Sequence, residues 1–232
     1  MNVLCVIPAR GGSKGLKNKN TIALCGKPII RYTIEAALDS KAIDRVVVST
    51  DCGKIAKVSS KARAEIVIRP KNLAKDSSAI EDSLRHAVEY LRRLDGYSPE
   101  IVVMLQANVP IRKKGQIDNV INRLKGSSAD SAATVFTVDQ HPQWMKRMGP
   151  KGCLYPLYPG AKSFRRQDIE PYYMLDGAVV AVKRKVLMRT KGRKGVHLFM
   201  GKKTVAVLQD KKYSVEIDKK EDLELARFIL HG

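Results

Sequence analysis

Short apolar runs alternate with amphipathic helical segments along most of the chain. Runs without polar interruption, such as residues 101–105, are typical of strands that are buried on both faces of a sheet. Strands separated by helices pair in parallel, and the helices then cover the sheet. We therefore predict an α/β fold, a mostly parallel sheet with helices on both faces. The predicted strands are residues 3–8, 45–49, 65–68, 101–105, 131–138, 177–182, 204–208 and 215–217, and the predicted helices are residues 28–38, 53–64, 77–94, 115–124 and 220–230.

The length and composition fit one globular domain. A chain of 232 residues, of which 44% are apolar, can bury a sizeable core, so we expect a single domain over residues 1–232. No apolar run approaches the ~20 residues of a membrane helix. Residues 1–10 lack the basic segment and the long apolar stretch of a signal peptide. We therefore expect a cytoplasmic protein with no membrane partner, and its four cysteines, which form no C-x-x-C pair, are expected to be free, buried thiols.

The chain carries 43 basic and 23 acidic residues, a formal net charge of +20. A charge of this size favours anionic partners: a nucleic acid, a nucleotide or an acidic metabolite. The basic residues are spread over the whole chain and are not interleaved with aromatic residues, as they are in proteins that bind single strands. Most are therefore expected on a solvated surface, and charge alone does not predict nucleic-acid binding. A basic nucleic-acid-binding protein remains the alternative from a different functional class.

A glycine-rich segment follows the first predicted strand. Residues 10–15 read Arg-Gly-Gly-Ser-Lys-Gly, and glycines let a backbone approach a ligand closely and turn its N–H groups towards phosphate oxygens. Arg10, Lys14 and Lys19 add cationic donors. The spacing is neither that of a P-loop nor that of a dinucleotide-binding loop. In parallel sheets ligands bind at the carboxyl ends of the strands, so this segment predicts a phosphate site at that edge.

Several short motifs occur in a fixed order over nearly the whole chain. The most specific is Ile7-Pro8-Ala9-Arg10-Gly11-Gly12-Ser13-Lys14-Gly15, followed by Lys19-Asn20. The others are Val48-Ser49-Thr50-Asp51, Arg69-Pro70 with Leu73 and Asp76-Ser77, Leu105-Gln106 with Pro110 and Arg112, Arg165-Arg166-Gln167-Asp168, Asp176-Gly177-Ala178, and Ser214-Val215-Glu216-Ile217-Asp218. Taken together, the set resembles the signature of the acylneuraminate cytidylyltransferases, the CMP-sialic acid synthetase family.

The sequence departs from this family's pattern at several places. Lys17-Asn18 replaces a Pro-Arg pair, Ala107-Asn108-Val109 replaces Pro-Thr-Ser, Asp176 replaces Asn, and Glu216 replaces an Asp. The identity of the sugar is therefore open between an N-acylneuraminate, legionaminate, pseudaminate and an eight-carbon ulosonate. GTP is the open alternative to CTP.

The resemblance implies a Rossmann-like nucleotidyltransferase fold and an enzyme that transfers CMP from CTP to the anomeric hydroxyl of an acidic nonulosonic sugar, releasing pyrophosphate. A triphosphate and a carboxylate sugar repel each other, so catalysis must neutralise negative charge and hold the reactants in line. The catalytic residues implied are Arg10, Lys19 and Asp218. The nucleotide-binding residues implied are Ala9, Arg10, Gly11, Gly12, Ser13, Asn20, Arg69, Asp76 and Ser77. Asp76 can equally cap a helix that begins at Ser77.

Two acidic residues near the C-terminus are candidate metal ligands. Glu216 and Asp218 lie two positions apart, so on a strand they point to the same face and both can meet one cation. Oxygen ligands beside a phosphate substrate favour Mg²⁺, with Mn²⁺ as a substitute. The alternative is an acidic pair that caps the helix beginning near Lys220, and the resemblance favours the metal site.

Residues 139–173 break the strand–helix pattern. The stretch is too long for an ordinary connection and is rich in Tyr, Trp, Met, Pro and Arg, of which all but Pro are enriched at interface cores. We predict a protruding extension that forms a homodimer, as the resemblance also implies. A lid over the chain's own site is the alternative. The substrate-binding residues implied by the resemblance are Gln106, Arg166, Gln167, Asp176 and Gly177.

Overall fold

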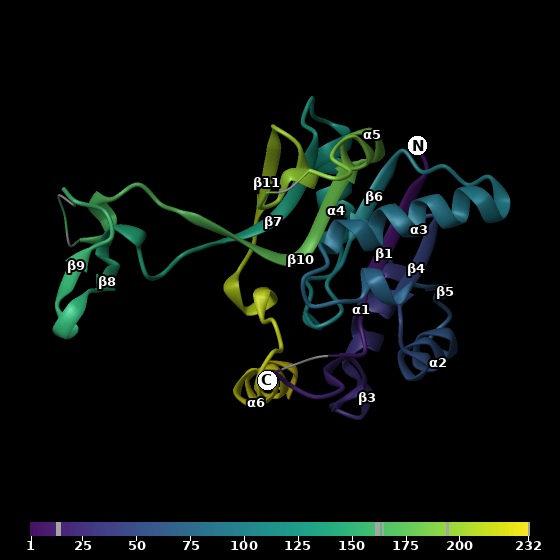
Figure 1. The fold of residues 1–232 in the computed structure, drawn as a ribbon, viewed down its shortest axis with the longest axis horizontal. Coiled ribbons are helices and arrows are strands. Elements are labelled where there is room, and N and C mark those ends of the chain that lie inside the picture. Colours follow the sequence, from purple (N-terminus) through teal and green to yellow (C-terminus); the bar gives the residue numbers. More distant parts are fainter. Residues whose placement is uncertain (13–14, 161–162, 164, 194, 232) are drawn as a thin grey trace.

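A seven-stranded sheet forms the centre of the computed structural model, which describes residues 1–12, 15–160, 163, 165–193 and 195–231. Its strand order is β11-β7-β10-β6-β1-β4-β5, and Figure 1 shows the strands in place. The strands are β1 (Val3–Pro8), β4 (Arg45–Thr50), β5 (Glu65–Ile68), β6 (Ile101–Met104), β7 (Ser131–Thr137), β10 (Tyr173–Lys183) and β11 (Thr204–Leu208).

Most neighbouring strands of this sheet are parallel. β1 pairs in parallel with β4 and β6, β4 pairs in parallel with β5, and β11 pairs in parallel with β7. Only β10 runs against its neighbours β6 and β7, and its register shifts at a bulge between Leu175 and Val180. The predicted mostly parallel sheet is confirmed, with one reversed strand inserted between β6 and β7.

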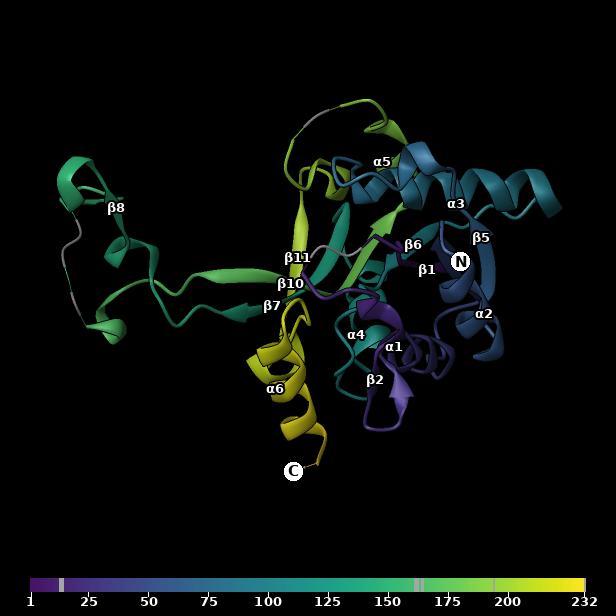
Figure 2. The same ribbon diagram turned by 60° about the horizontal axis from the view of Figure 1, so that its bottom comes forward.

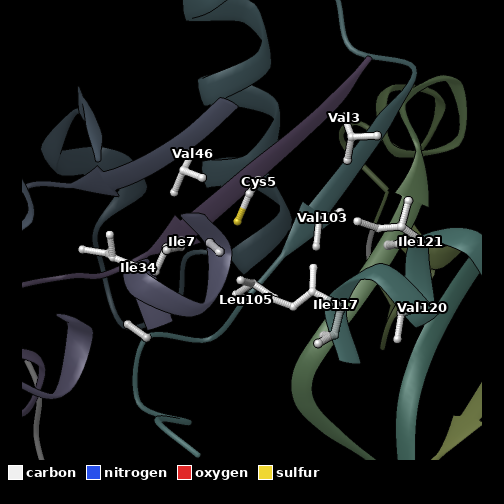
Figure 3. Close-up of a cluster of buried hydrophobic side chains, with 14 of the residues drawn as sticks. Val3, Cys5, Ile7, Ile34, Val46, Val103, Leu105, Ile117, Val120 and Ile121 are labelled. Atoms are coloured by element: carbon white, nitrogen blue, oxygen red, sulfur yellow. The ribbon is translucent and has the colours of Figure 1, made fainter. Parts of the chain in front are cut away.

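Helices cover both faces of the sheet. Because side chains alternate along a strand, Val3, Cys5 and Ile7 of β1 point into one core cluster, which Figure 3 shows. This cluster is completed by α1 (Ile29–Leu38), α2 (Gly53–Lys61) and α4 (Gln116–Lys125). Leu4 and Val6 point to the other face, where α3 (Ile80–Asp95) and α5 (Arg184–Arg189) pack. The predicted helices on both faces are confirmed.

The C-terminal helix α6 (Lys220–His231) packs away from the sheet, at the lower end of the molecule in Figure 1. It forms a third apolar cluster with the small hairpin of β2 (Ala23–Leu24) and β3 (Lys27–Pro28) and with the start of α1. Ile217, just before α6, is completely buried in this cluster. The chain leading into α6 is therefore anchored close to the segment that follows β1.

The stretch between β7 and β10 projects from the body of the molecule, as Figures 1 and 2 both show. It contains a two-stranded hairpin, β8 (Lys146–Met148) and β9 (Leu154–Pro156). It also contains the short 3-10 helices η3 (Pro142–Trp144), η4 (Pro150–Gly152) and η5 (Arg166–Asp168). At its base the His141 ring stacks on Tyr172 at 4.6 Å, and His141 Nε2 lies 3.1 Å from the backbone oxygen of Glu170. The predicted protruding extension is present.

Three local predictions were wrong. Residues 215–217 are not a strand but follow the 3-10 helix η7 (Lys211–Ser214) without regular structure. The helix predicted from Ser77 begins at Ile80 with Ala79 at its N-cap, so Asp76 does not cap it. All four cysteines are free, but only Cys5 is buried. Burial raises the pKa of the Cys5 thiol to about 12, so this thiol is unreactive at neutral pH.

The remaining short elements lie in connections. They are η1 (Lys19–Thr21), η2 (Lys71–Leu73) and η6 (Leu198–Met200). Among the helices of the described residues, none combines the length and the apolar character needed to cross a membrane.

Candidate functional site

A cleft of about 410 Å³ lies at the carboxyl ends of β1 and β6. The ends of parallel strands meet at one edge of a sheet, which is where α/β folds bind ligands. In the described part of the chain, four segments line this cleft: residues 8–20, 69–80, 106–108 and 216–218. Eight of the seventeen predicted site residues come together here. Those lining the cleft are Arg10, Lys19, Asn20, Arg69, Asp76, Gln106, Glu216 and Asp218.

The glycine-rich segment after β1 makes two close backbone approaches. A Cβ atom on Gly11 would lie 2.9 Å from Cys52 Cβ, and a Cβ atom on Gly15 would lie 2.6 Å from the backbone oxygen of Asp218. The Gly11 N–H also donates to Asp51 Oδ1 at 3.0 Å. These glycines therefore permit close packing against neighbouring segments. Space beside Gly12 is open, whereas the predicted nucleotide-binding residue Ser13 and the neighbouring Lys14 lie outside the described residues.

Two ion pairs cross the cleft. Arg10 Nη1 pairs with Asp76 Oδ1, and Lys19 Nζ lies 2.5 Å from Asp218 Oδ1. All four side chains are partly exposed to solvent. Ion pairs in such positions contribute about 0–1 kcal/mol. A polyanion can therefore compete for the two cationic groups at little cost to the fold.

The segment after β5 supplies a third cationic side chain, Arg69. Arg69 is 7% exposed, and burial lowers the pKa of its guanidinium. Its Nε has no hydrogen-bond partner among the described residues, which leaves donor capacity beside the cleft. Ser77 is exposed, and its neighbour Ser78 lines the cleft instead. Ser78 Oγ donates to the Asn72 backbone oxygen at 3.1 Å and so fixes this segment.

The two candidate metal ligands converge without a strand. Asn108 Nδ2 donates to Glu216 Oε1 at 3.0 Å and to Asp218 Oδ1 at 3.3 Å. Both carboxylates therefore lie beside one nitrogen atom at the edge of the cleft. No group of three or more His, Cys, Asp or Glu side chains gathers within the described ranges. A pair of carboxylates fits Mg²⁺, which keeps several waters and takes further oxygens from a phosphate substrate.

Gln106 and Gly177 lie against each other at the end of β6. Gly177 has φ +66°, and a Cβ atom on it would lie 2.4 Å from Gln106 Cδ, so only glycine fits without moving Gln106. Gln106 Oε1 is buried and has no partner in the described structure. Arg112 holds the turn that follows, because its Nη2 donates to the Gln106 backbone oxygen at 2.9 Å and its Nη1 donates to that of Val109. Loss of water around this guanidinium lowers the pKa of Arg112 to about 10.

Asp176 is buried and uses both carboxylate oxygens within the protein. Oδ1 accepts from Thr134 Oγ1 at 2.5 Å and from the Ala178 N–H at 2.9 Å. Oδ2 accepts from Gln209 Nε2 at 2.5 Å and from Ser214 Oγ at 2.9 Å. These bonds join β7, β10 and the segment before η7. A substrate contact for Asp176 stays a prediction.

A comparison with protein families identifies the family of this chain. The model of the family described as cytidylyltransferase matches residues 4–232. The chain belongs to this family. The resemblance found in the sequence motifs is confirmed.

Two relatives of this cytidylyltransferase family member match most of its length. It is 30% identical over 224 residues to an N-acylneuraminate cytidylyltransferase of Streptococcus agalactiae serotype III, covering 96% of this chain and 52% of that protein. The chain thus spans about half the length of this relative. It is 32% identical over 198 residues to a CMP-N,N'-diacetyllegionaminic acid synthase of Legionella pneumophila, covering 82% of each.

A solved structure shows the same fold. The structure of CMP:2-keto-3-deoxy-manno-octonic acid synthetase, complexed with CTP, superposes with a TM-score of 0.74 at 19% identity, covering 100% of this chain and 99% of that one. At this identity the likeness establishes the fold, and the Rossmann-like nucleotidyltransferase fold implied by the motifs is confirmed.

The cleft of this family member contains residues that the sequence did not single out. In the sequence Asn108 is only a departure from the family pattern, whereas in the structure it bonds both candidate metal ligands. Lys75 and Ser78 line the cleft beside Asp76. The signal for Asn108 was its place directly after a buried strand. By contrast, Arg166 and Gln167 lie in η5 within the extension, away from the four described segments that line the cleft.

Proposed function

We propose that this protein transfers CMP from CTP to the anomeric hydroxyl of an acidic nonulosonic sugar, an N-acylneuraminate or a relative, and releases pyrophosphate. The observation that carries the proposal is the cleft lined by Arg10, Lys19, Glu216 and Asp218, in which Lys19 pairs with Asp218. Cations that can bind a triphosphate there lie next to carboxylates that can hold a metal. The names of the relatives from Streptococcus and Legionella support the choice of a cytidylyl group and an acidic sugar.

Different residues of the cleft bind the substrates and neutralise their charge. Arg10 and Lys19 bind phosphate oxygens once their carboxylate partners are displaced, which places positive charge where the transition state concentrates negative charge. Arg69 offers donors to the nucleotide, and Gln106 offers an amide to the sugar hydroxyls. The sugar hydroxyl oxygen attacks the α-phosphorus and loses its proton to solvent, and the bond to the leaving pyrophosphate oxygen breaks on the opposite side. No protein nucleophile is required.

Mg²⁺ is the proposed cofactor, with Asp218 and Glu216 as its protein ligands and Mn²⁺ as a substitute. Held by Asp218 and Glu216, a divalent cation would supply positive charge to offset the triphosphate and would polarise the phosphorus under attack. Asp218→Ala is expected to lower turnover at least about 100-fold while the protein stays folded, because it removes a charge beside the reacting phosphate and no core packing. Pyrophosphate release with and without EDTA, and circular dichroism, measure the two effects. Glu224→Gln on the exposed side of α6 is the control, and near-normal turnover of Asp218→Ala in saturating Mg²⁺ contradicts the assignment.

A panel of substrates tests the reaction itself. Purified protein is assayed for pyrophosphate release with CTP or GTP and with N-acetylneuraminate, legionaminate, pseudaminate or an eight-carbon ulosonate. We expect release that requires CTP, Mg²⁺ and one of the nine-carbon sugars. Release with GTP or only with the ulosonate overturns that part of the proposal. Salt-sensitive binding to DNA or RNA without any pyrophosphate release supports the nucleic-acid-binding alternative.

The extension, residues 139–173 with the start of β10, is proposed to form a homodimer. It stands clear of the body in both views, and large apolar side chains are exposed along it. A concentrated apolar surface of this kind favours a protein interface. Among the described residues of the extension, the exposed large apolar side chains are Met145, Met148, Leu154, Tyr155, Leu157, Tyr158, Tyr172, Tyr173 and Met174.

Two measurements distinguish a dimer whose subunits share an active site from a lid over the chain's own cleft. Sedimentation at micromolar concentration is expected to give about twice the chain mass of 25.8 kDa. Mixing Arg10→Ala chains with Arg166→Ala chains is expected to restore part of the activity, if η5 of one subunit completes the cleft of the other. An active monomer overturns the dimer, and a dimer without complementation overturns the shared site.

A further inference from the structure

The segment that carries both candidate metal ligands has no regular structure to hold it. Residues 215–218 lie between η7 and α6 and are neither helix nor strand. Backbone and side chains in such a segment keep one position only where specific contacts fix them. One contact is the buried side chain of Ile217 in the α6 cluster. It anchors the segment but does not orient the carboxylates on either side.

A further contact is Asn108, which follows β6 and forms hydrogen bonds with the segment. Its backbone oxygen accepts from the Ile217 N–H at 2.8 Å. Its Nδ2 lies 3.0 Å from Glu216 Oε1, 3.3 Å from the Ile217 backbone oxygen and 3.3 Å from Asp218 Oδ1. One residue therefore bonds three consecutive residues of the segment, and this residue is 6% exposed.

The backbone around Asn108 is itself fixed by hydrogen bonds. The turn that carries it is closed by the Val109 N–H, which donates to the Gln106 oxygen at 3.4 Å. The guanidinium of Arg112 bonds the Gln106 and Val109 backbone oxygens on either side of Asn108. The amide nitrogen of Asn108 is thus held relative to the sheet. Asp218 is also held by the Lys19 ion pair and by its own N–H, which donates to Asp222 Oδ2 at 2.9 Å, but Asn108 is the residue that bonds both Glu216 and Asp218.

The chemistry of the amide suits this task. Two carboxylates at one site repel each other, and neutral N–H donors offset part of that repulsion. Lys19 pairs with Asp218 alone, whereas the Asn108 amide bonds both carboxylates. A shorter hydroxyl side chain offers one donor in place of two, and an aspartate would add a third negative charge. Building on the function proposed above, we propose that Asn108 is a positioning residue that presents Glu216 and Asp218 together to the divalent cation.

The test compares Asn108→Leu with Val120→Ala. The first variant removes the amide and roughly keeps the volume. The second trims a buried side chain in α4, and it is the control for general destabilisation. Hydrogen exchange of the peptide covering residues 215–219 is measured in metal-free protein. We expect exchange about 10-fold faster in Asn108→Leu and unchanged exchange in Val120→Ala. Asn108→Ala replaces the leucine variant if that one does not fold.

A second measurement tests binding of the divalent cation directly. Mn²⁺ binding in the presence of CTP is followed by electron paramagnetic resonance, and the Mg²⁺ concentration for half-maximal pyrophosphate release is measured in parallel. We expect both apparent constants to rise about 10-fold in Asn108→Leu, with kcat largely recovered at high Mg²⁺. Unchanged metal dependence, or a kcat that falls without a shift in metal dependence, overturns the proposal. If the wild-type chain releases no pyrophosphate, the proposed function fails, while exchange and Mn²⁺ binding still decide the role of Asn108.

Discussion

Replacing Gly15 by alanine is expected to push the glycine-rich segment away from the carboxylate segment. A Cβ atom on Gly15 would lie 2.6 Å from the backbone oxygen of Asp218, whereas ordinary van der Waals contact begins near 3.4 Å. The difference, about 0.8 Å, is the separation that the two backbones must gain. Gly15 is not among the glycines with positive φ, so the substitution adds no backbone strain of that kind. The displacement is the whole effect.

The size of the effect follows from the position of this contact. Lys19 and Asp218 must act on the same triphosphate, and a misplacement of about 1 Å in such an arrangement can cost about 100-fold in rate. We therefore expect the turnover of Gly15→Ala to fall roughly 10- to 100-fold, which corresponds to about 1.4–2.7 kcal/mol of activation free energy.

The assay is pyrophosphate release at saturating CTP, sugar and Mg²⁺. Gly53→Ala is the matched control, because Gly53 begins α2 and a Cβ atom there would have nothing within 4 Å. This control is expected to keep its turnover. A Gly15→Ala protein that is folded by circular dichroism and retains turnover within twofold of the wild type refutes the argument from close approach.

Three further predictions rest on single residues. Asp176→Asn is expected to change the free energy of unfolding by less than about 1 kcal/mol, because Gln209 Oε1 has no partner in the described structure and can accept from the new amide. Asp176→Leu leaves buried donors without an acceptor, so it is expected to lower the free energy of unfolding by roughly 3 kcal/mol. Urea denaturation measures both changes. Asp130→Asn is expected to flatten the decline of melting temperature at acid pH. Backbone N–H groups of the segment before β11 lower the pKa of Asp130 below its ordinary 3.8, so its stabilisation is present above that pH and is lost as pH falls through the folded-state pKa. Gly177→Ala is expected to raise the KM for the sugar more than the KM for CTP, because its Cβ atom would displace Gln106.

Each of these has an outcome that contradicts it. Equal losses of stability in Asp176→Asn and Asp176→Leu would mean that the negative charge, and not the set of acceptors, is required. An acid melting profile of Asp130→Asn that follows the wild type contradicts the assigned pKa shift. A Gly177→Ala protein whose KM for CTP rises as much as that for the sugar places Gln106 in the nucleotide site.

The sequence by itself determined the sheet, its helical layers and the place of the cleft. The alternation of side chains along residues 3–8 fixes which apolar residues face each layer, and this follows from strand geometry alone. The glycine-rich segment directly after that strand placed a binding edge at the end of β1, where the cleft lies. These features depend on neighbouring residues in the chain, so local patterns are sufficient to predict them.

Only the tertiary structure decided how the distant residues of the cleft meet. Glu216 and Asp218 converge without the strand that their spacing predicted, because Asn108, more than 100 positions earlier, holds both. Asp76 pairs with Arg10 and does not cap α3. Asp176, which motif similarity placed at the sugar, has both oxygens occupied by donors from Thr134 and from the segment before η7. Such contacts join residues far apart in the chain, and their geometry is set by packing of the whole core, which no local pattern encodes.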